Sequence, residues 1–143
     1  MPILGHGVDI VAIERIERML EEHGERFEER CFTAGERAYS NESAKVRGER
    51  FAARFAAKEA VLKALGTGLR YGLSFDEIEV CRSGEGAPFL FLSGKAAAMA
   101  AKHGIDGWHL SLSHAGGFAV ASVIAEGIVG ARGSIAPPAP LAE

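Results

Sequence analysis

An α+β domain is the fold that the sequence predicts, with helices packed on a small, mainly antiparallel sheet. The first observation is length, because 143 residues match the size of one domain. The second is the order of the elements: a strand, three helices, a strand pair, a helix and another strand pair, without a solenoid repeat. The third is composition, since 48% hydrophobic and 24% charged residues are typical of globular proteins and exclude a disordered chain.

The chain is predicted to begin with a strand and a helix. Residues 3–11 are mostly apolar, which favours a strand, and Gly5 and Gly7 within it indicate a bend or a close approach of another backbone. Residues 12–22 have apolar side chains at helical spacing, and Gly24 is a suitable end for that helix.

Two more helices are expected before the middle of the chain. Thr33 and Glu36 form a capping-box pattern, which predicts a short helix that ends near Tyr39. The longest helical candidate covers residues 43–65 and ends at the glycine-rich segment 66–68. That segment lacks the pattern of a phosphate-binding loop, so a helix stop is its default interpretation.

The second half alternates between strands and one helix. Residues 78–80 and 89–92 are predicted to form a hairpin, and an alanine-rich helix should follow at residues 95–103. Residues 108–113 and 118–124 look like two further strands joined by a glycine turn.

The domain is expected to occupy residues 1–126. From residue 127 onward glycine, alanine and proline dominate, and prolines exclude regular structure there. Residues 127–143 are therefore predicted to be a flexible tail.

Cysteine usage and hydropathy indicate a reduced, cytoplasmic protein. Cys31 and Cys81 are too few for a disulfide framework and match no zinc motif, so both are predicted to be packing residues. The longest near-apolar run, residues 116–125, is shorter than the roughly 20 residues that span a bilayer. A basic segment followed by an apolar run is missing from the N-terminus, so we expect no signal peptide and no membrane association.

Positive charge is concentrated in the long helix. The net charge of −3 argues against a nucleic-acid binder, yet residues 45–63 contain six basic side chains and two acidic ones, Glu49 and Glu59. Two interpretations stay open: a solvated helix face, or a site for a polyanion such as a phosphate-rich cofactor.

Helical spacing divides this helix into faces. The apolar residues that should form its buried stripe are Phe51, Phe55, Leu62 and Leu65. The basic residues that share a neighbouring face are Arg47, Arg50, Arg54 and Lys58.

Polar residues stand out at three other places. Asp9 interrupts an apolar run, so its carboxylate must cap the next helix, form an ion pair or bind a cation. Glu59 and Lys63 are spaced as a helix-surface ion pair, which is their simplest interpretation. His114 lies at a strand end beside a glycine turn, where both structural and functional histidines occur.

The combination of motifs resembles a known family more closely than any single motif does. The matching segments are, in order, Gly7-Val8-Asp9-Ile10-Val11, Arg15-Ile16, Phe32-Thr33, Arg54-Phe55-Ala56-Ala57-Lys58-Glu59-Ala60, Lys63-Ala64-Leu65-Gly66-Thr67-Gly68 and Leu110-Ser111-Leu112-Ser113-His114. Together they span about residues 3–125 and resemble the holo-(acyl-carrier-protein) synthases, the short, single-domain branch of the 4′-phosphopantetheinyl transferases. The resemblance implies the fold of that family.

The resemblance also implies an activity. Members of the family transfer 4′-phosphopantetheine from coenzyme A to a serine of an apo-acyl-carrier protein and release adenosine 3′,5′-bisphosphate, as in fatty-acid biosynthesis. They use Mg²⁺ and are typically homotrimers with sites between subunits. The resemblance therefore implies Mg²⁺ and coenzyme A as ligands, and an acyl-carrier protein and two further copies of the chain as partners.

Matching the motifs residue by residue implies the following roles. Asp9 and Glu59 would hold Mg²⁺, and Lys63 would reach the reacting phosphate. The residues implied to contact the nucleotide and its phosphates are Arg47, Arg54, His114 and the backbone of Gly66, Thr67 and Gly68. Arg15 and Arg18 would face the acidic carrier protein. The segment 115–118 departs from the family pattern, which puts side-chain roles there in doubt.

The chemistry of phosphoryl transfer agrees with these residue types. Such reactions depend on positioning and charge neutralisation, and Mg²⁺ usually takes one or two carboxylates plus phosphate oxygens and waters. The carrier protein supplies the nucleophilic serine, so no catalytic serine or cysteine is needed. Glu59 and a metal-bound water remain alternative bases for that serine.

Two other functions are compatible with parts of the pattern. A non-catalytic module could bind a nucleotide or an acidic partner through the basic helix face. A histidine-based metal hydrolase that uses Asp9 and His114 would need more ligands than the sequence offers at recognisable spacing.

Overall fold

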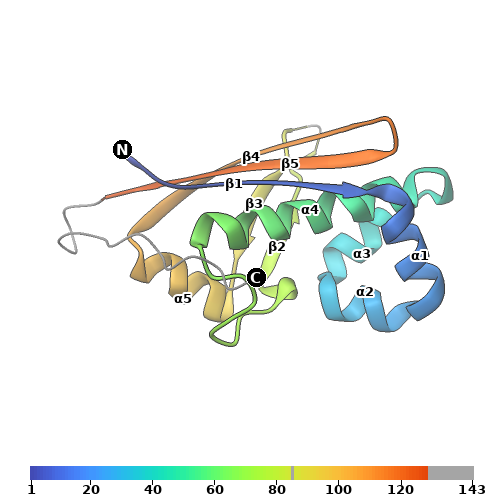
Figure 1. Cartoon of the computed structure of the whole chain (residues 1–143), viewed down its shortest axis with the longest axis horizontal. Helices are drawn as coiled ribbons and strands as arrows, with labels where there is room; N and C mark the ends of the chain where they lie inside the picture. The colour runs from blue at the N-terminus through green and yellow to red at the C-terminus, as the bar shows by residue number, and fades with distance from the viewer. Residues whose placement is uncertain (85, 129–143) are drawn as a thin grey trace.

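A long helix, α4 (Arg47–Leu65), lies along one face of a three-stranded antiparallel sheet (Figure 1). The computed structural model describes residues 1–84 and 86–128. In the sheet, β5 (Phe118–Gly127) lies between β1 (Ile3–Ala12) and β4 (Ile105–Ala115). The α+β prediction is confirmed, and both predicted hairpins pair antiparallel.

Strand alternation places one side of this sheet on α4. Ala119, Ala121 and Val123 of β5 are fully buried, and the residues between them point to the opposite side. Asp9 of β1 pairs with Ala121 in the register, so it lies on the side that faces α4.

Helix α4 has the buried stripe that its sequence predicts. Phe51 and Leu65 are fully buried, and Phe55 and Leu62 are nearly so. A 3₁₀ turn, Ala44–Val46, precedes the helix, so the regular α-helical part begins later than the predicted residue 43. Gly66 ends the helix in the left-handed conformation at φ 73°, as expected of a glycine stop.

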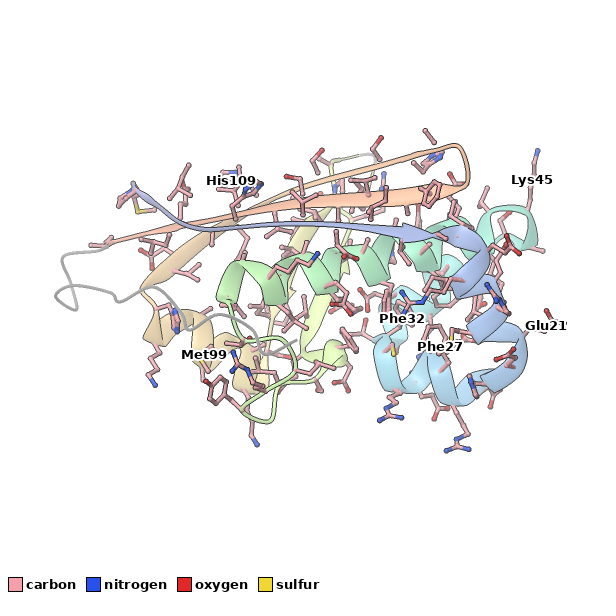
Figure 2. The ribbon with its side chains drawn as sticks, in the orientation of Figure 1. Glu21, Phe27, Phe32, Lys45, Met99 and His109 are labelled. Atoms are coloured by element: carbon pink, nitrogen blue, oxygen red, sulfur yellow. The ribbon has the colours of Figure 1, made fainter. Side chains whose placement is uncertain are left out.

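The helices α1 (Ile13–His23), α2 (Glu25–Cys31) and α3 (Ala34–Ser40) gather at one end of α4. Helix α2 was not predicted from the sequence. It is too short for a clear period, and most of its residues are charged, so only Phe27 and Cys31 mark its buried side. Figure 2 shows Phe27 and Phe32 among these helices. Their ring centroids lie 5.7 Å apart.

A second unit packs against both α4 and the sheet strand β4 (Figure 1). It contains a 3₁₀ turn η2 (Phe75–Glu77), the hairpin strands β2 (Ile78–Cys81) and β3 (Phe89–Leu92), and the helix α5 (Gly94–Lys102). The Glu77 carboxylate accepts hydrogen bonds from the backbone N–H groups of Ser74 and Lys95, which ties the turn to the start of α5.

The predicted domain boundary at residue 126 lies one residue before the end of β5. Strand β5 ends at Gly127, which was predicted to be the first residue of the tail, and residues 129–143 of that tail lie outside the described residues. In the described part of the chain, no helix is long and apolar enough to cross a membrane. Cys31 is buried in the core and Cys81 is half-buried, and both thiols are free.

Candidate active site

Asp9, Glu59 and Lys63 come together where β1 crosses α4. The Lys63 ammonium donates to Asp9 Oδ1 at 3.1 Å and to the backbone carbonyl of Val8 at 2.9 Å. Glu59 precedes Lys63 by one helical turn, so both side chains leave α4 on the same side. The structure therefore joins residues that lie about 50 positions apart in the sequence, and the ion-pair partner of Lys63 is Asp9 of β1.

Two glycines let β1 lie directly on α4. A Cβ atom at Gly7 would stand 1.9 Å from the carbonyl oxygen of Ala60, and one at Gly5 would stand 2.4 Å from that of Ala64. No real Cβ atom tolerates such distances to backbone, so only glycine fits at these positions. The predicted close approach of another backbone is confirmed, and it sets the separation between Asp9 and Glu59.

Gly7→Ala is expected to damage the site and the fold together. The new methyl group must push β1 away from α4, which moves Asp9 from Glu59 and opens the core; overpacking of this kind costs about 1–3 kcal/mol. Chemical denaturation and initial transfer rates would measure both effects. Gly116→Ala is the matched control, because open space surrounds Gly116, although its φ of 58° adds backbone strain. Equal transfer rates in wild type and Gly7→Ala would contradict this role for Gly7.

The two carboxylates repel one another. Burial raises the pKa of Glu59, the charge of Asp9 raises it further, and Lys63 and Arg15 oppose the shift. A cation between the carboxylates would relieve this repulsion. Among the described residues, no group of three or more His, Cys, Asp or Glu side chains could hold a metal. The two carboxylates of Asp9 and Glu59 fit Mg²⁺, which commonly takes one or two carboxylates and completes its shell with substrate oxygens and waters.

A basic cavity lies further along α4, toward its N-terminus. Its volume is about 300 Å³, and its charged lining residues are Glu49, Arg50, Arg54, Arg82 and His114. Arg54 is 3% exposed, and its pKa is lowered mainly by burial. His114 extends from β4, and its Nε2 atom lies 2.6 Å from the Glu49 carboxylate. The cavity joins the predicted Arg54 and His114 with Arg82 and Tyr39, which the sequence did not mark.

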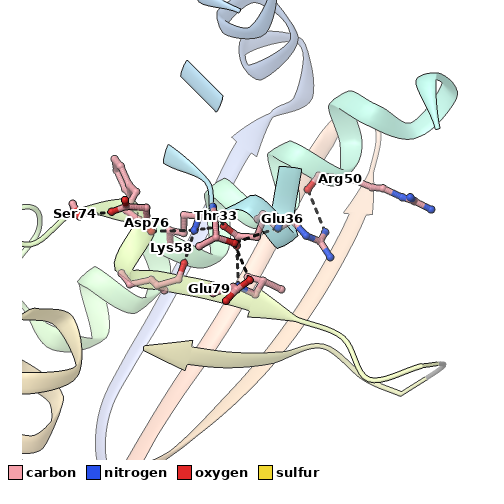
Figure 3. Close-up of polar contacts among 11 residues, drawn as sticks. Thr33, Glu36, Arg50, Lys58, Ser74, Asp76 and Glu79 are labelled. Atoms are coloured by element: carbon pink, nitrogen blue, oxygen red, sulfur yellow. Dashed lines mark hydrogen bonds and ion pairs between the residues drawn. The ribbon is translucent and has the colours of Figure 1, made fainter. Parts of the chain in front are cut away.

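Lys58 is not part of this basic surface, which corrects the sequence prediction. It is fully buried and donates to Glu36 Oε1 at 2.6 Å and to the backbone carbonyls of Phe75 and Ile78 (Figure 3). Glu36 is also the capping-box residue of α3 and accepts from the Val80 N–H at 2.8 Å. Lys58 is thus a structural cation that joins α4, α3 and β2, and it has no free proton for a phosphate.

Arg47 lies at the first turn of α4 and is held by acidic and amide partners. Its guanidinium donates to Glu28 Oε2 at 2.9 Å and to Asn41 Oδ1 at 2.5 Å. A phosphate ligand would therefore have to compete with Glu28 for Arg47. Its predicted contact with the nucleotide remains a prediction.

The glycine-rich segment after α4 is ordered by its own contacts. Thr67 is buried and donates to the Gly68 carbonyl at 3.0 Å, while Arg70 donates to the carbonyls of Gly66 and Thr67. These bonds hold the loop at the end of α4, one turn beyond Lys63. A contact between this backbone and the nucleotide remains a prediction.

Arg15 and Arg18 are exposed on α1, beside a large groove. Arg15 lies over the ring of Phe55, 5.7 Å from its centroid. The groove measures about 740 Å³; its basic lining residues are His23, Arg26 and Arg30, and its apolar ones are Met19, Phe27, Phe55, Leu69, Leu73 and Phe75. It starts next to the Asp9–Glu59–Lys63 centre, because Phe55 is one turn before Glu59 on α4.

The structure does not support the alternative function of a histidine-based metal hydrolase. His114 contacts Glu49, whereas Asp9 contacts Lys63, so the two proposed ligands belong to different clusters. Ser113 and His114 are neighbours on β4, so they point to opposite sides of the strand and form no nucleophile–base pair.

Comparisons with known proteins identify the family of the chain. Residues 5–121 match the family model of the 4′-phosphopantetheinyl transferase superfamily. A holo-(acyl-carrier-protein) synthase of Koribacter versatilis is 48% identical over 124 residues, which cover 87% of this chain and 98% of that protein.

Solved structures of similar proteins extend the comparison. The holo-(acyl-carrier-protein) synthase of Neisseria meningitidis is 35% identical, with a TM-score of 0.79 over 87% of this chain and 99% of that one. The enzyme of Bacillus anthracis, in complex with CoA (3′,5′-ADP), is 40% identical, with a TM-score of 0.72 over 88% of this chain and 98% of that one. The chain therefore belongs to the 4′-phosphopantetheinyl transferase superfamily, in its holo-(acyl-carrier-protein) synthase branch.

Proposed function

We propose that the chain transfers the 4′-phosphopantetheine group from coenzyme A to a serine of an apo-acyl-carrier protein. The observation that carries this proposal is the convergence of Asp9, Glu59 and Lys63 at the crossing of β1 and α4. Membership of the holo-(acyl-carrier-protein) synthase branch supports the same reaction. A coenzyme A complex of a similar enzyme supports the donor.

Asp9 and Glu59 would hold Mg²⁺ against the diphosphate of coenzyme A. Bound there, Mg²⁺ would neutralise charge on the reacting phosphate oxygens. Lys63 donates to Asp9 in the free protein, and its ammonium can turn toward the diphosphate as negative charge develops on the leaving group. The bond that breaks joins the β-phosphate to the bridging oxygen, so adenosine 3′,5′-bisphosphate leaves.

Glu59 or a water on the metal would accept the proton of the attacking serine. In the free protein, burial and the charge of Asp9 raise the pKa of Glu59, and a bound Mg²⁺ would oppose that shift. The large groove beside Phe55 would receive the carrier protein, with Arg15 and Arg18 facing its acidic side chains. The basic cavity at Arg54 and His114 would receive the remaining phosphate of coenzyme A.

A homotrimer is proposed as the active assembly. The side of the sheet away from α4 exposes Val8, Ile10 and Phe118, with 46%, 61% and 46% of their surface accessible. His109 lies on that side as well (Figure 2). A second copy of the chain is the partner that the family resemblance implies for this apolar face, and the third copy closes the ring.

Sedimentation equilibrium tests this assembly. Wild type is expected to sediment at three times the chain mass of 15.1 kDa. Ile10→Glu places a charge in the contact and should shift the mass toward the monomer, because an unpaired buried charge is expensive. Ile128→Glu is the matched control, since Ile128 is exposed outside the sheet. A wild-type mass of one chain at micromolar concentration would contradict the trimer.

We propose the cytoplasm as the location of the protein. Both cysteine thiols are free, and burial raises the pKa of Cys31, which keeps that thiol protonated and unreactive.

Release of adenosine 3′,5′-bisphosphate tests the reaction itself. In the presence of coenzyme A and Mg²⁺, the nucleotide should appear only when an apo-acyl-carrier protein is added. A carrier protein whose acceptor serine is replaced by alanine should release none. Binding of coenzyme A without nucleotide release would favour the non-catalytic binding module instead.

A further inference from the structure

Three arginine side chains gather on the ring of Tyr39. The guanidinium carbons of Arg50, Arg54 and Arg82 lie 4.1, 4.3 and 5.7 Å from its centroid. Two of them come from α4 and the third follows β2, so the ring of α3 joins three elements. Each distance is within the range of a cation–π contact.

Like charges at such proximity repel one another, and local contacts offset this only in part. Arg50 donates to the Tyr39 carbonyl at 2.9 Å and lies 3.8 Å from the exposed carboxylate of Glu42. Arg54 donates to the Arg50 carbonyl at 3.3 Å, but its Nε atom is buried without a hydrogen-bond partner. Besides burial, the charges of Arg82 and Arg50 lower the pKa of Arg54. An anion at this cluster would be stabilised strongly.

Two cavities border the cluster. One of about 300 Å³ contains Arg50 and His114 in its wall, and one of about 240 Å³ contains Glu79 and Cys81. Tyr39, Arg54 and Arg82 line both of them. The ring and its arginines are thus accessible to a ligand from both cavities.

Position along α4 indicates which phosphate would reach the cluster. Arg54 and Arg50 precede Glu59 by five and nine residues, so at 1.5 Å per residue they lie about 8 and 14 Å from it along the helix axis. The reacting diphosphate belongs beside Glu59. The phosphate at the far end of coenzyme A, which the ribose separates from the diphosphate, would then lie along α4 toward Arg54.

We propose that Tyr39 is a positioning residue, an aromatic platform that holds Arg50, Arg54 and Arg82 together to receive this terminal phosphate. This inference rests on the proposed function and adds a specificity to it. Tyr39 makes the enzyme prefer coenzyme A over dephospho-coenzyme A, which lacks that phosphate. Tyr39 acts through the arginines, because its ring is already covered by their guanidinium groups.

Steady-state kinetics of Tyr39 variants with both donors test the inference. Tyr39→Leu removes the ring and should raise KM for coenzyme A about tenfold, since loss of two to three cation–π contacts is of that order. Its kcat, its KM for the carrier protein and its KM for dephospho-coenzyme A should stay as in wild type. Tyr39→Phe keeps the ring and should restore the wild-type KM.

Controls separate this role from a loss of folding. Tyr71→Leu removes the other tyrosine, which is exposed and carries Arg70 at 5.5 Å, and should leave KM for coenzyme A unchanged. If Tyr39→Leu does not fold, Arg82→Gln, a change of an exposed side chain, should raise KM for coenzyme A and not for dephospho-coenzyme A.

Several outcomes would overturn the inference. The first is a KM for coenzyme A that rises as much in Tyr39→Phe as in Tyr39→Leu. The second is a KM that rises equally for both donors in Tyr39→Leu, and the third is a KM for coenzyme A that Tyr39→Leu leaves unchanged. Calorimetric binding of adenosine 3′,5′-bisphosphate gives a readout that needs no turnover, and Tyr39→Leu should weaken it about tenfold. If wild type transfers from neither donor, the proposed function fails, whereas unaltered selectivity in active variants refutes only the role of Tyr39.

Discussion

Asp9→Asn and Glu59→Gln are each expected to abolish measurable transfer while the protein stays folded. Each change keeps the shape of the side chain and removes one of the two charges that would hold Mg²⁺. Either change removes the repulsion between the two carboxylates, and Asp9→Asn also weakens the ion pair with Lys63, so stability should stay close to that of wild type. At each Mg²⁺ concentration, the initial rate of carrier-protein modification should be about a thousandfold below that of wild type. This is the size of effect seen when electrostatic stabilisation is lost.

Matched variants distinguish a metal role from a general loss of charge. Glu22→Gln changes an exposed glutamate of α1 and should keep the wild-type rate and Mg²⁺ dependence. Lys63→Met removes the ammonium partner of Asp9 but keeps both carboxylates, so it should slow transfer yet leave the Mg²⁺ requirement in place. Wild-type rates in both Asp9→Asn and Glu59→Gln would contradict the assignment of these carboxylates as metal ligands.

Lys58→Ala is expected to cause the largest loss of stability of any single change considered. It leaves the Glu36 carboxylate buried without its cation and leaves the carbonyls of Phe75 and Ile78 without donors. Removing one partner of a buried pair typically costs about 3–5 kcal/mol. The urea concentration at the midpoint of unfolding should therefore decrease strongly. If the variant is unfolded at 25 °C, both proteins are compared at a lower temperature.

A double variant tests whether the cost comes from the orphaned charge. Lys58→Met with Glu36→Leu replaces the pair by apolar side chains of similar volume, so it should recover the part of the lost stability that comes from the orphaned charge, although the N–H groups of Thr33 and Val80 then lose their acceptor. Lys58→Ala with Glu36→Leu should recover less, because it leaves a cavity. A Lys58→Ala protein as stable as wild type would show that the pair contributes nothing to the fold.

Local patterns in the sequence predicted the elements that local forces create. The capping box of Thr33 and Glu36 is present with both of its hydrogen bonds, at 2.9 and 3.2 Å. The apolar stripe of α4 is buried, and Gly5 and Gly7 mark the close approach of β1 to α4. Asp9 could be recognised because a carboxylate in an apolar strand needs a partner.

Long-range partners explain what local patterns missed. Lys58 shares the period of Arg54, but its partners Glu36 and Ile78 lie 22 residues before it and 20 residues after it, so spacing alone could not separate a buried cation from a phosphate ligand. Tyr39 and Arg82 meet Arg54 only because α3 and β2 pack on α4. An aromatic residue near several arginines is the signal that would have drawn attention to Tyr39.

The mass of an apo-acyl-carrier protein, measured after incubation with the chain, coenzyme A and Mg²⁺, tests the central claim most directly. Wild type should add the mass of one phosphopantetheine group to the acceptor serine, and chelation of Mg²⁺ should stop the addition. Asp9→Asn and Glu59→Gln, folded and at equal concentration, should leave the mass unchanged. A wild-type protein that binds coenzyme A but leaves the carrier protein at its original mass would contradict the account.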